Sequence, residues 1–284
     1  MTFIDFCRVH GLLVDSIAEG RWIRVPTADH PRAKNGAYKF MGDIGWCQNH
    51  AQSPEVSTWR TDAQAPAVDT QRIANQAAAF DRKMQEGWSR AAHRAQQLIS
   101  NAKQGEHSYL QFKGLHAERG LVLDDGALLV PMRNWRTNDL QGAQVIRWMP
   151  DERRYDKKML PGMRAKGAVL RLGTAQAGRS WLVEGLATGL SVDAALRLLN
   201  LRDSVVVCFS AGNLMQVAPL ISGDRMVFAD NDESGAGERA AVATGLRYCM
   251  SPDLGDANDM HKSRGVFAVA SLITKTVAER ETVP

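Results

Sequence analysis

The sequence predicts an α/β protein whose C-terminal part is a doubly wound parallel sheet. From residue 179 onward, apolar runs such as residues 180–184 and 204–209 alternate with helical patterns such as residues 187–199 and 213–221. Strands that alternate with helices of this length are typical of a parallel sheet with helices on both faces. Two of the apolar runs end directly in carboxylates, at the strand ends where such sheets present polar groups.

Residues 1–60 are expected to form a small N-terminal module. Apolar residues at helical spacing predict a helix over residues 3–17, and the alternation in residues 21–26 predicts a strand. Basic residues alternate with aromatic ones between His30 and Trp59. That composition fits two interpretations: a surface on which single-stranded nucleic acid stacks, or a small β-rich core with a basic rim.

Residues 61–105 are expected to be a helical linker. Residues 61–66 are polar and contain a proline, and residues 68–103 are rich in Ala, Gln and Arg, with only Gly87 as an interruption. Such a composition predicts one long helix or two shorter ones.

Residues 106–178 are expected to form a mixed α+β subdomain. Two apolar runs, residues 121–123 and 128–131, flank the turn Asp124-Asp125-Gly126 and predict a hairpin, and residues 144–148 alternate like a further strand. The α/β domain proper is then residues 179–284. Within it a strand is predicted over residues 225–230, and helices over residues 237–248 and 265–277.

Bulk properties limit the class of protein only loosely. The chain has 284 residues and a formal net charge of +4, and its pI of about 8.9 permits nucleic-acid binding without requiring it. Four scattered cysteines indicate reduced thiols, as in a cytoplasm. The apolar runs are too short to span a membrane, and residues 1–14 make a poor signal peptide, so we expect a cytoplasmic protein without a membrane partner.

Three acidic residues carry the strongest functional signal. Glu184 ends the run Trp181-Leu182-Val183, while Asp230 and Asp232 end the run Met226–Ala229. If both runs are parallel strands, their carboxyl ends meet at one edge of the sheet. Clustered carboxylates repel one another and are the ligands that Mg²⁺ or Mn²⁺ prefers, so this edge is expected to hold a divalent cation. Each acid taken singly also fits a helix N-cap or a solvated loop.

A basic segment precedes these acids. Residues 147–171 contain eight Lys and Arg residues and three acidic residues, a local excess of five positive charges. Positive charge ahead of an acidic metal site is typical of a path for phosphates, although a solvated basic loop has the same composition.

Four motifs in this order resemble the Toprim domain of bacterial-type primases, topoisomerases and some nucleases, and most closely the primases of phages and conjugative plasmids. They are Glu184-Gly185-Leu186-Ala187-Thr188, Ala211-Gly212-Asn213-Leu214, Asp230-Asn231-Asp232 and Asp256-Ala257-Asn258-Asp259. Upstream, Lys113-Gly114-Leu115 resembles the subdomain that precedes Toprim in primases, and the likeness covers residues 105–265.

The resemblance implies a DNA primase, a nucleotidyltransferase that makes short RNA primers on single-stranded DNA from nucleoside triphosphates. It implies Mg²⁺ or Mn²⁺ held by Glu184, Asp230 and Asp232. Asp256 and Asp259 would extend the site through a further ion, or Asp256 would only cap the next helix. It also implies that basic and amide side chains contact nucleotide or template, namely Arg147, Lys157, Lys158, Lys166 and Asn213; turn formation is the other role open to Asn213.

Two departures from the family pattern bear on partners. A paired Cys-x-x-Cys zinc ribbon is absent; the doubled Cys-x-x-His of Cys7, His10, Cys47 and His50 could hold zinc, but core packing is the favoured role. The sequence also lacks a Gly-x-x-x-x-Gly-Lys-Ser/Thr loop, so a separate helicase in a bacterial host cell is expected. Two alternatives stay open: a Toprim-type nuclease and a non-catalytic nucleic-acid-binding protein.

Overall fold

The computed structural model describes residues 1–50, 52, 55–61, 70–174 and 177–278, which form two compact units, Met1–Lys83 and Met84–Pro284. The boundary falls inside a helix, α2 (Thr70–Asn101). Of the predicted helical linker, residues 62–69 lie outside the described residues, and residues from Thr70 onward form α2. The finer division of the chain into four parts stays a prediction.

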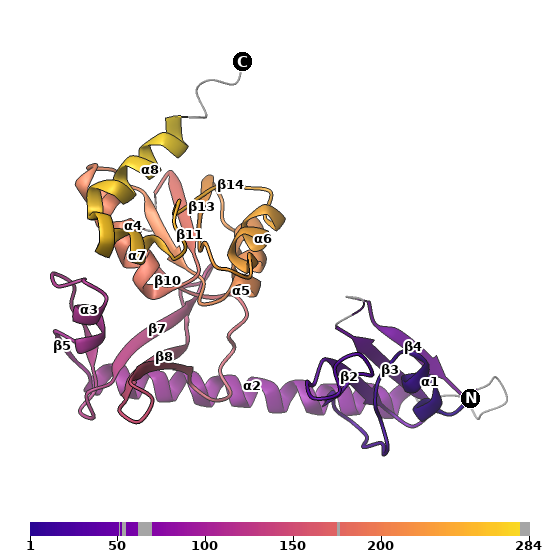
Figure 1. Ribbon diagram of the computed structural model, residues 1–284. Coiled ribbons are helices and arrows are strands. Elements are labelled where there is room, and N and C mark those ends of the chain that lie inside the picture. The colour runs from indigo at the N-terminus through magenta and orange to yellow at the C-terminus, as the bar shows by residue number, and fades with distance from the viewer. Residues whose placement is uncertain (51, 53–54, 62–69, 175–176, 279–284) are drawn as a thin grey trace. The chain divides into compact units, whose positions relative to one another are not determined.

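The first unit is a four-stranded antiparallel sheet with one short helix (Figure 1). Its elements are α1 (Phe3–Val9), β1 (Ile23–Val25), β2 (Gly36–Phe40), β3 (Ile44–Asn49) and β4 (Ser57–Arg60). The predicted strand at residues 21–26 is confirmed as β1. The predicted helix over residues 3–17 is wrong beyond Val9, because Gly11 adopts a φ of +75° and Leu12 then forms a β-bridge with Thr27.

Aromatic residues of this unit pack together in its core. The ring of Phe3 lies 5.0 Å from that of Phe40, 5.6 Å from Trp59 and 6.0 Å from Tyr38. Cys7 and Cys47 are buried beside them, and their thiols hydrogen-bond to one another. The structure therefore gives these aromatic side chains the role of a β-rich core, and it places the two cysteines in that core.

Helix α2 is a single helix, since Gly87 does not interrupt it (Figure 1). Ala95 and Leu98, near its C-terminal end, pack against Leu129 and Ala143 in the larger unit. This contact covers one face of the strands that follow.

The strands of the larger unit form one ten-stranded mixed sheet among the described residues. Its first part contains β5 (Lys103–Gly105), β6 (Gly120–Val122), β7 (Leu128–Asn134), β8 (Leu140–Met149), β9 (Arg154–Met159) and β10 (Ala168–Leu172), with α3 (Ser108–Phe112) after β5. The predicted hairpin is confirmed as β6 and β7, and the predicted strand at residues 144–148 lies within β8. Gly126 provides the positive φ, +78°, at the hairpin turn.

The second part of the sheet is parallel and doubly wound, which confirms the predicted α/β class. Its strands are β11 (Arg179–Val183), β12 (Ser204–Val207), β13 (Asp224–Ala229) and β14 (Arg247–Met250), in the order β14-β13-β11-β12. Helices α4 (Leu186–Leu198), α7 (Ala257–Arg264) and α8 (Val266–Ala278) pack on one face. Helices α5 (Ala211–Val217) and α6 (Ala236–Ala243) pack on the other (Figure 1).

One boundary inside this part differs from the sequence prediction. The helix predicted over residues 237–248 ends at Ala243, because Gly245 adopts a φ of +68° and turns the chain. Residues from Arg247 onward form β14, which pairs in parallel with β13. The sequence prediction therefore lacked strand β14 and also helix α7, which follows β14 in the chain.

None of the helices described by the structure combines the length and the apolar character needed to cross a lipid bilayer.

Candidate functional site

The order of the parallel strands reverses between β11 and β13. From β11 the chain passes through α4 to β12 on one side, and it then crosses back to place β13 on the other side. Leu182 pairs with Val227, so Glu184 and Asp230 follow the two strands at the same edge of the sheet. Open α/β sheets bind ligands at such a reversal point, where the outgoing connections leave a crevice.

The carboxyl group of Asp230 is held in an unusual state. Its Oδ1 atom is buried and has no hydrogen-bond partner. Burial, and after it the negative charges of Asp256, Glu184, Asp232 and Asp259, raise the pKa of Asp230 to about 7. A buried carboxylate oxygen without a partner is costly unless a proton or a cation joins it.

Asp232 lies in the opposite situation, in the turn that leads into α6. Its side chain accepts hydrogen bonds from the Ser234 hydroxyl and from the backbone N–H groups of Ala236 (3.2 Å) and Gly237 (3.1 Å). Hydrogen bonding by Ser234 and Gly237 lowers the pKa of Asp232 to about 2, so this carboxylate stays charged at neutral pH.

Gly237 allows this turn to close onto the end of β13. A Cβ atom at Gly237 would lie 2.2 Å from the backbone oxygen of Asp230, a distance that no side chain tolerates. Because Gly237 has no side chain, the first turn of α6 can pack against the backbone of Asp230 while its N–H group donates to the carboxylate of Asp232.

Asn231 joins a second loop to the same edge. Its backbone exchanges two hydrogen bonds with Gly255, at 3.0 and 2.8 Å, and its side-chain amide donates to the carbonyl groups of Ser251 and Asp253. The loop after β14 is thereby fixed beside the end of β13. Asp230, Asp232, Asp256 and Asp259 consequently line one depression of about 410 Å³.

Asp256 caps helix α7, as one of the two sequence interpretations proposed. Its Oδ1 atom accepts from the backbone N–H groups of Asn258 (2.7 Å) and Asp259 (2.9 Å). Its Oδ2 atom accepts from the hydroxyl of Thr188, at 3.0 Å, on α4. These bonds fix the carboxylate and leave its charge facing the depression, so capping and a contribution to the acidic site are compatible.

Glu184 lies beside the same group of carboxylates. It is about half buried, and burial, followed by the charge of Asp232, raises its pKa above the ordinary glutamate value. The backbone N–H of Ala211, at the start of α5, donates a hydrogen bond that opposes this shift. The structure thus brings together the acids that the sequence singled out, Glu184, Asp230, Asp232, Asp256 and Asp259.

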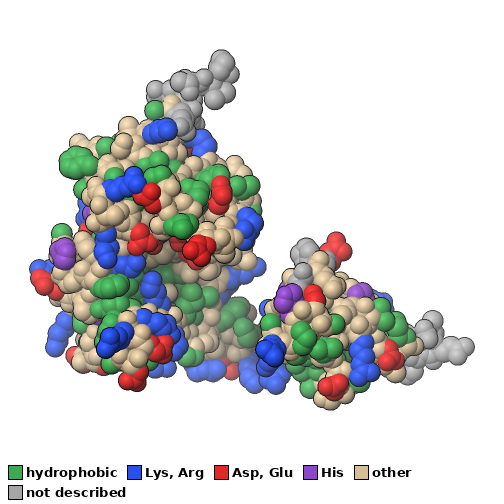
Figure 2. Space-filling model, viewed as in Figure 1, with side chains coloured by type: hydrophobic (Ala, Val, Ile, Leu, Met, Phe, Trp, Pro, Cys, Tyr) green, Lys and Arg blue, Asp and Glu red, His purple; other side chains and the backbone are tan. Residues whose placement is uncertain are grey.

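Mixed charge is visible on the surface of the larger unit. In Figure 2 acidic side chains gather along the lower rim of its upper part, with basic and hydrophobic side chains on the surface below them. One cation lies beside the acids of the depression: the Nζ atom of Lys113 is 3.9 Å from Asp259 Oδ1.

The donor set fits a hard divalent cation. All five side chains offer oxygen, and Asp230 Oδ1 lacks any other partner. Within the described residues, no three His, Cys, Asp or Glu side chains lie close enough, as placed, to hold a metal ion. Mg²⁺ commonly takes only one or two carboxylates, with water and substrate phosphates as its other ligands. One or two of these acids would therefore supply the protein ligands that the ion needs.

The four basic residues predicted from the sequence lie in three different places. Lys157 pairs with Ile146 across β8 and β9, on the face that packs around Tyr109, and its Nζ atom lies 5.3 Å from that ring. Side chains alternate along a strand, so Lys158 and Arg147 lie on the opposite face.

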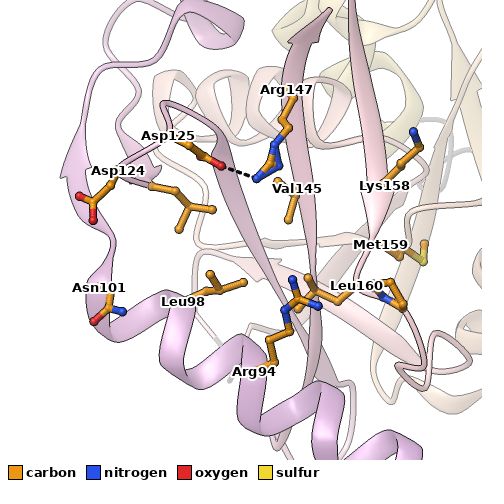
Figure 3. Close-up of a pocket in the computed structure, with 12 residues that line it drawn as sticks. Arg94, Leu98, Asn101, Asp124, Asp125, Val145, Arg147, Lys158, Met159 and Leu160 are labelled. Atoms are coloured by element: carbon orange, nitrogen blue, oxygen red, sulfur yellow. Dashed lines mark hydrogen bonds and ion pairs between the residues drawn. The ribbon is translucent and has the colours of Figure 1, made fainter.

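That opposite face forms a cavity of about 540 Å³ against α2. Figure 3 shows its lining side chains, which come from α2, the β6–β7 turn, β8 and β9. Arg147 contacts Asp125 at 2.5 Å, and Lys158 pairs with Asp156 at 2.8 Å. Both cations therefore have carboxylate partners.

Lys166 and Asn213 line a separate depression of about 230 Å³ at the start of α5. The Asn213 amide donates to the carbonyls of Ala168 and Cys208 and accepts from the N–H of Gly167, each at 2.8 Å. In this arrangement Asn213 fixes the turn that carries Lys166, and its contact with a nucleotide stays a prediction.

Sequence reasoning missed several residues that shape the site: Tyr109, Thr188, Asn231 and Asn258. Thr188, Asn231 and Asn258 fall inside the quoted motifs, so the signal was present, but a motif does not reveal which partner each polar side chain will find. Asn258 donates to the Lys113 carbonyl at 2.8 Å and so connects α7 to the end of α3, more than a hundred residues earlier in the chain.

Comparisons with known proteins give limited similarity. No model of a protein family matches the chain, and no curated protein matches it. Among solved structures, the RNA polymerase domain of Mycobacterium tuberculosis primase DnaG aligns with a TM-score of 0.38 and 17% identity, covering 71% of this chain and 66% of that chain, just under two thirds. The same domain in complex with a double-stranded DNA oligomer with a 6-nucleotide overhang aligns with a TM-score of 0.36 and 16% identity, over 75% of this chain and 74% of that chain.

Proposed function

We propose that the chain is a DNA primase, which synthesises short RNA primers on single-stranded DNA by metal-dependent nucleotidyl transfer. The observation that carries the proposal is the partnerless buried Oδ1 atom of Asp230 at the reversal point of the sheet, with four further carboxylates around it. Supporting it are the four ordered motifs, three of which contribute acids to this edge.

In the proposed reaction, the 3′-hydroxyl oxygen of the primer bonds to the α-phosphorus of a nucleoside triphosphate. The bond from that phosphorus to the bridging oxygen breaks, pyrophosphate leaves, and the hydroxyl proton passes to solvent or to a carboxylate. A bound Mg²⁺ or Mn²⁺ ion would neutralise phosphate charge and align the reacting groups.

We assign Asp230, Asp232 and Glu184 to holding that ion, with one or two of them as direct ligands and with water and substrate phosphates as its other ligands. Asp232 is charged at neutral pH because its turn stabilises the carboxylate, and Asp230 offers an oxygen with no competing partner. Asp256, fixed by Thr188, and Asp259, paired with Lys113, extend the negative surface toward a further ion. Lys157, which lies over the Tyr109 ring, and Lys166, which lines a depression with Asn213, are assigned to phosphate groups.

The partners that follow from the proposal are single-stranded DNA, nucleoside triphosphates and a separate replicative helicase, in the cytoplasm of a bacterial cell that hosts a phage or plasmid.

The test is primer synthesis on single-stranded DNA with labelled nucleoside triphosphates and Mg²⁺ or Mn²⁺. The wild type should yield short RNA, and Asp230→Asn and Glu184→Gln should yield none while keeping the fold. Asp139→Asn, the same change at an exposed residue of the β7–β8 turn, is the matched control and should stay active. Full activity in folded Asp230→Asn would reject the assignment.

The nuclease alternative uses the same acids with water as the nucleophile. It predicts that the template is degraded in the same assay and that nucleoside triphosphates are not consumed. Binding of DNA without either reaction, with and without a divalent cation, would instead favour a non-catalytic binding protein.

A further inference from the structure

Two exposed aromatic side chains, Phe112 and Trp148, form a row with the partly buried Tyr155 between them, beside the acidic depression. The ring of Tyr155 on β9 lies 5.0 Å from Trp148 on β8 and 5.7 Å from Phe112 at the end of α3. Trp148 is 47% exposed and Phe112 is 59% exposed. We call these three residues the aromatic row.

The row begins at the core, where Tyr155 packs against Tyr109, and extends outward from it. Trp148 and Tyr155 are cross-strand partners, two residues beyond the pair Ile146 and Lys157 on the same face. Ile146 is fully buried, whereas Trp148 extends past the edge of that core. Large aromatic groups left in water next to one another typically mark an interaction surface.

Positive charge flanks the row. Lys262 Nζ lies 5.0 Å from the ring centroid of Phe112, and Lys157, next on the same face of β9 after Tyr155, lies over Tyr109. The nearby acids do not offset these cations, because Glu152 pairs with Arg154 and Asp156 with Lys158.

The row also leads to the acidic depression. Lys113, the residue after Phe112, pairs with Asp259, which lines the depression. Lys262 lies one turn after Asp259 on α7. A ligand stacked on Phe112 would therefore lie next to the carboxylates assigned to catalysis.

We propose that the aromatic row binds single-stranded nucleic acid by stacking its bases, with Lys157 and Lys262 contacting the phosphates, and leads the strand to the acidic depression. Exposed rings interleaved with cations are the arrangement that such strands require, since every base has a face that stacks on an aromatic ring. The proposal rests on the proposed function for the direction of the strand, and on the row itself for the binding.

The test measures binding of an oligodeoxynucleotide that carries 2-aminopurine, whose fluorescence falls when it stacks on a ring. Phe112→Leu and Trp148→Leu keep an apolar side chain but remove the ring, and each should weaken binding by about tenfold and restore fluorescence. Phe112→Trp keeps a ring and should bind as the wild type does.

Phe267→Leu is the matched control, because Phe267 is 73% exposed on α8 and lies outside the row. It should leave binding and quenching unchanged. Circular dichroism of every variant verifies the fold, and Phe112→Trp separates a loss of stacking from a loss of structure at the same position.

Unchanged affinity and quenching in both leucine variants would overturn the proposal. So would self-association of the wild type that Phe112→Leu abolishes while DNA binding persists, because the row would then join two copies of the chain. If the leucine variants lose stacking but the wild type makes no primers, the binding role of the aromatic row is supported and the primase proposal is rejected. Asp230→Asn should quench 2-aminopurine as the wild type does, whether or not the wild type makes primers.

Discussion

Asp230 and Asp232 lie two residues apart at the end of β13, yet their carboxyl groups have pKa values of about 7 and about 2. Asp230 is buried among other acids, while Asp232 accepts hydrogen bonds from the turn before α6. Two carboxyl groups with such different acidity in one site are typical of functional centres. A cation that replaces the proton on Asp230 would relieve the repulsion among these acids.

The first prediction concerns stability without metal. A raised carboxyl pKa contributes stability below the ordinary value of 3.8, and that stability is lost as pH rises through about 7. In EDTA at about pH 8, Asp230→Asn should therefore be more stable than the wild type by about 2 kcal/mol, and at about pH 5 the two should be similar. Urea unfolding at the two pH values measures this, with Asp139→Asn as the control. Equal stability at both pH values would contradict it.

The second prediction concerns the cation itself. Mg²⁺ or Mn²⁺ at about one hundred times its Kd should stabilise the wild type by about 2.7 kcal/mol, because only the folded chain assembles the acids. The rise in Tm should be larger at about pH 8 than at about pH 6, since the proton on Asp230 competes with the ion. Thermal unfolding with and without the cation measures both effects. A rise of the same size in Asp230→Asn would show that the ion binds elsewhere.

The third prediction concerns the turn that joins β13 to α6. Gly237→Ala should destabilise the protein by about 1–3 kcal/mol, because the new methyl group meets the Asp230 carbonyl at 2.2 Å. Gly212→Ala in α5 is the matched control: nothing lies within 4 Å of its Cβ position, and it should be neutral or stabilising by up to about 1 kcal/mol. Urea unfolding of both variants decides the matter, and a neutral Gly237→Ala would mean that the turn can relax.

The acidic edge could be predicted because two local patterns, apolar runs and the carboxylates that end them, are sufficient to place Glu184 and Asp230 once the strands are parallel. The sequence could not show that Asp230 is buried without a partner, since burial depends on Asn231 and Gly237 drawing two loops over it. The end of the helix predicted over residues 237–248 was wrong because Gly245 can also occur inside a helix, and only the pairing of β14 with β13 decides the outcome.

The basic residues were grouped by sequence rather than by face. Lys157 and Lys158 are neighbours in the chain, and once residues 154–159 form a strand they must point to opposite faces. No strand was predicted there, because charged residues outnumber apolar ones in that segment. The sequence also gave no sign of the aromatic row, because Phe112 and Tyr155 are far apart in the chain and meet only in the folded protein.

The fourth prediction separates the two roles of Asp256. Asp256→Ala should destabilise the protein by about 1 kcal/mol, because α7 loses the oxygen that accepts from the backbone of Asn258 and Asp259. Asp256→Asn keeps an oxygen for the cap and should cost little stability, yet it removes a negative charge beside Asp230 and should lower the affinity for Mn²⁺. Urea unfolding measures the cap, and a Mn²⁺ titration followed by electron paramagnetic resonance measures the charge. Asp253→Asn, an exposed acid on the preceding loop that pairs with Arg264, is the matched control and should keep its affinity for Mn²⁺. If Asp256→Asn binds Mn²⁺ as tightly as the wild type, Asp256 is a helix cap alone, and the acidic site consists of the carboxylates at the ends of β11 and β13.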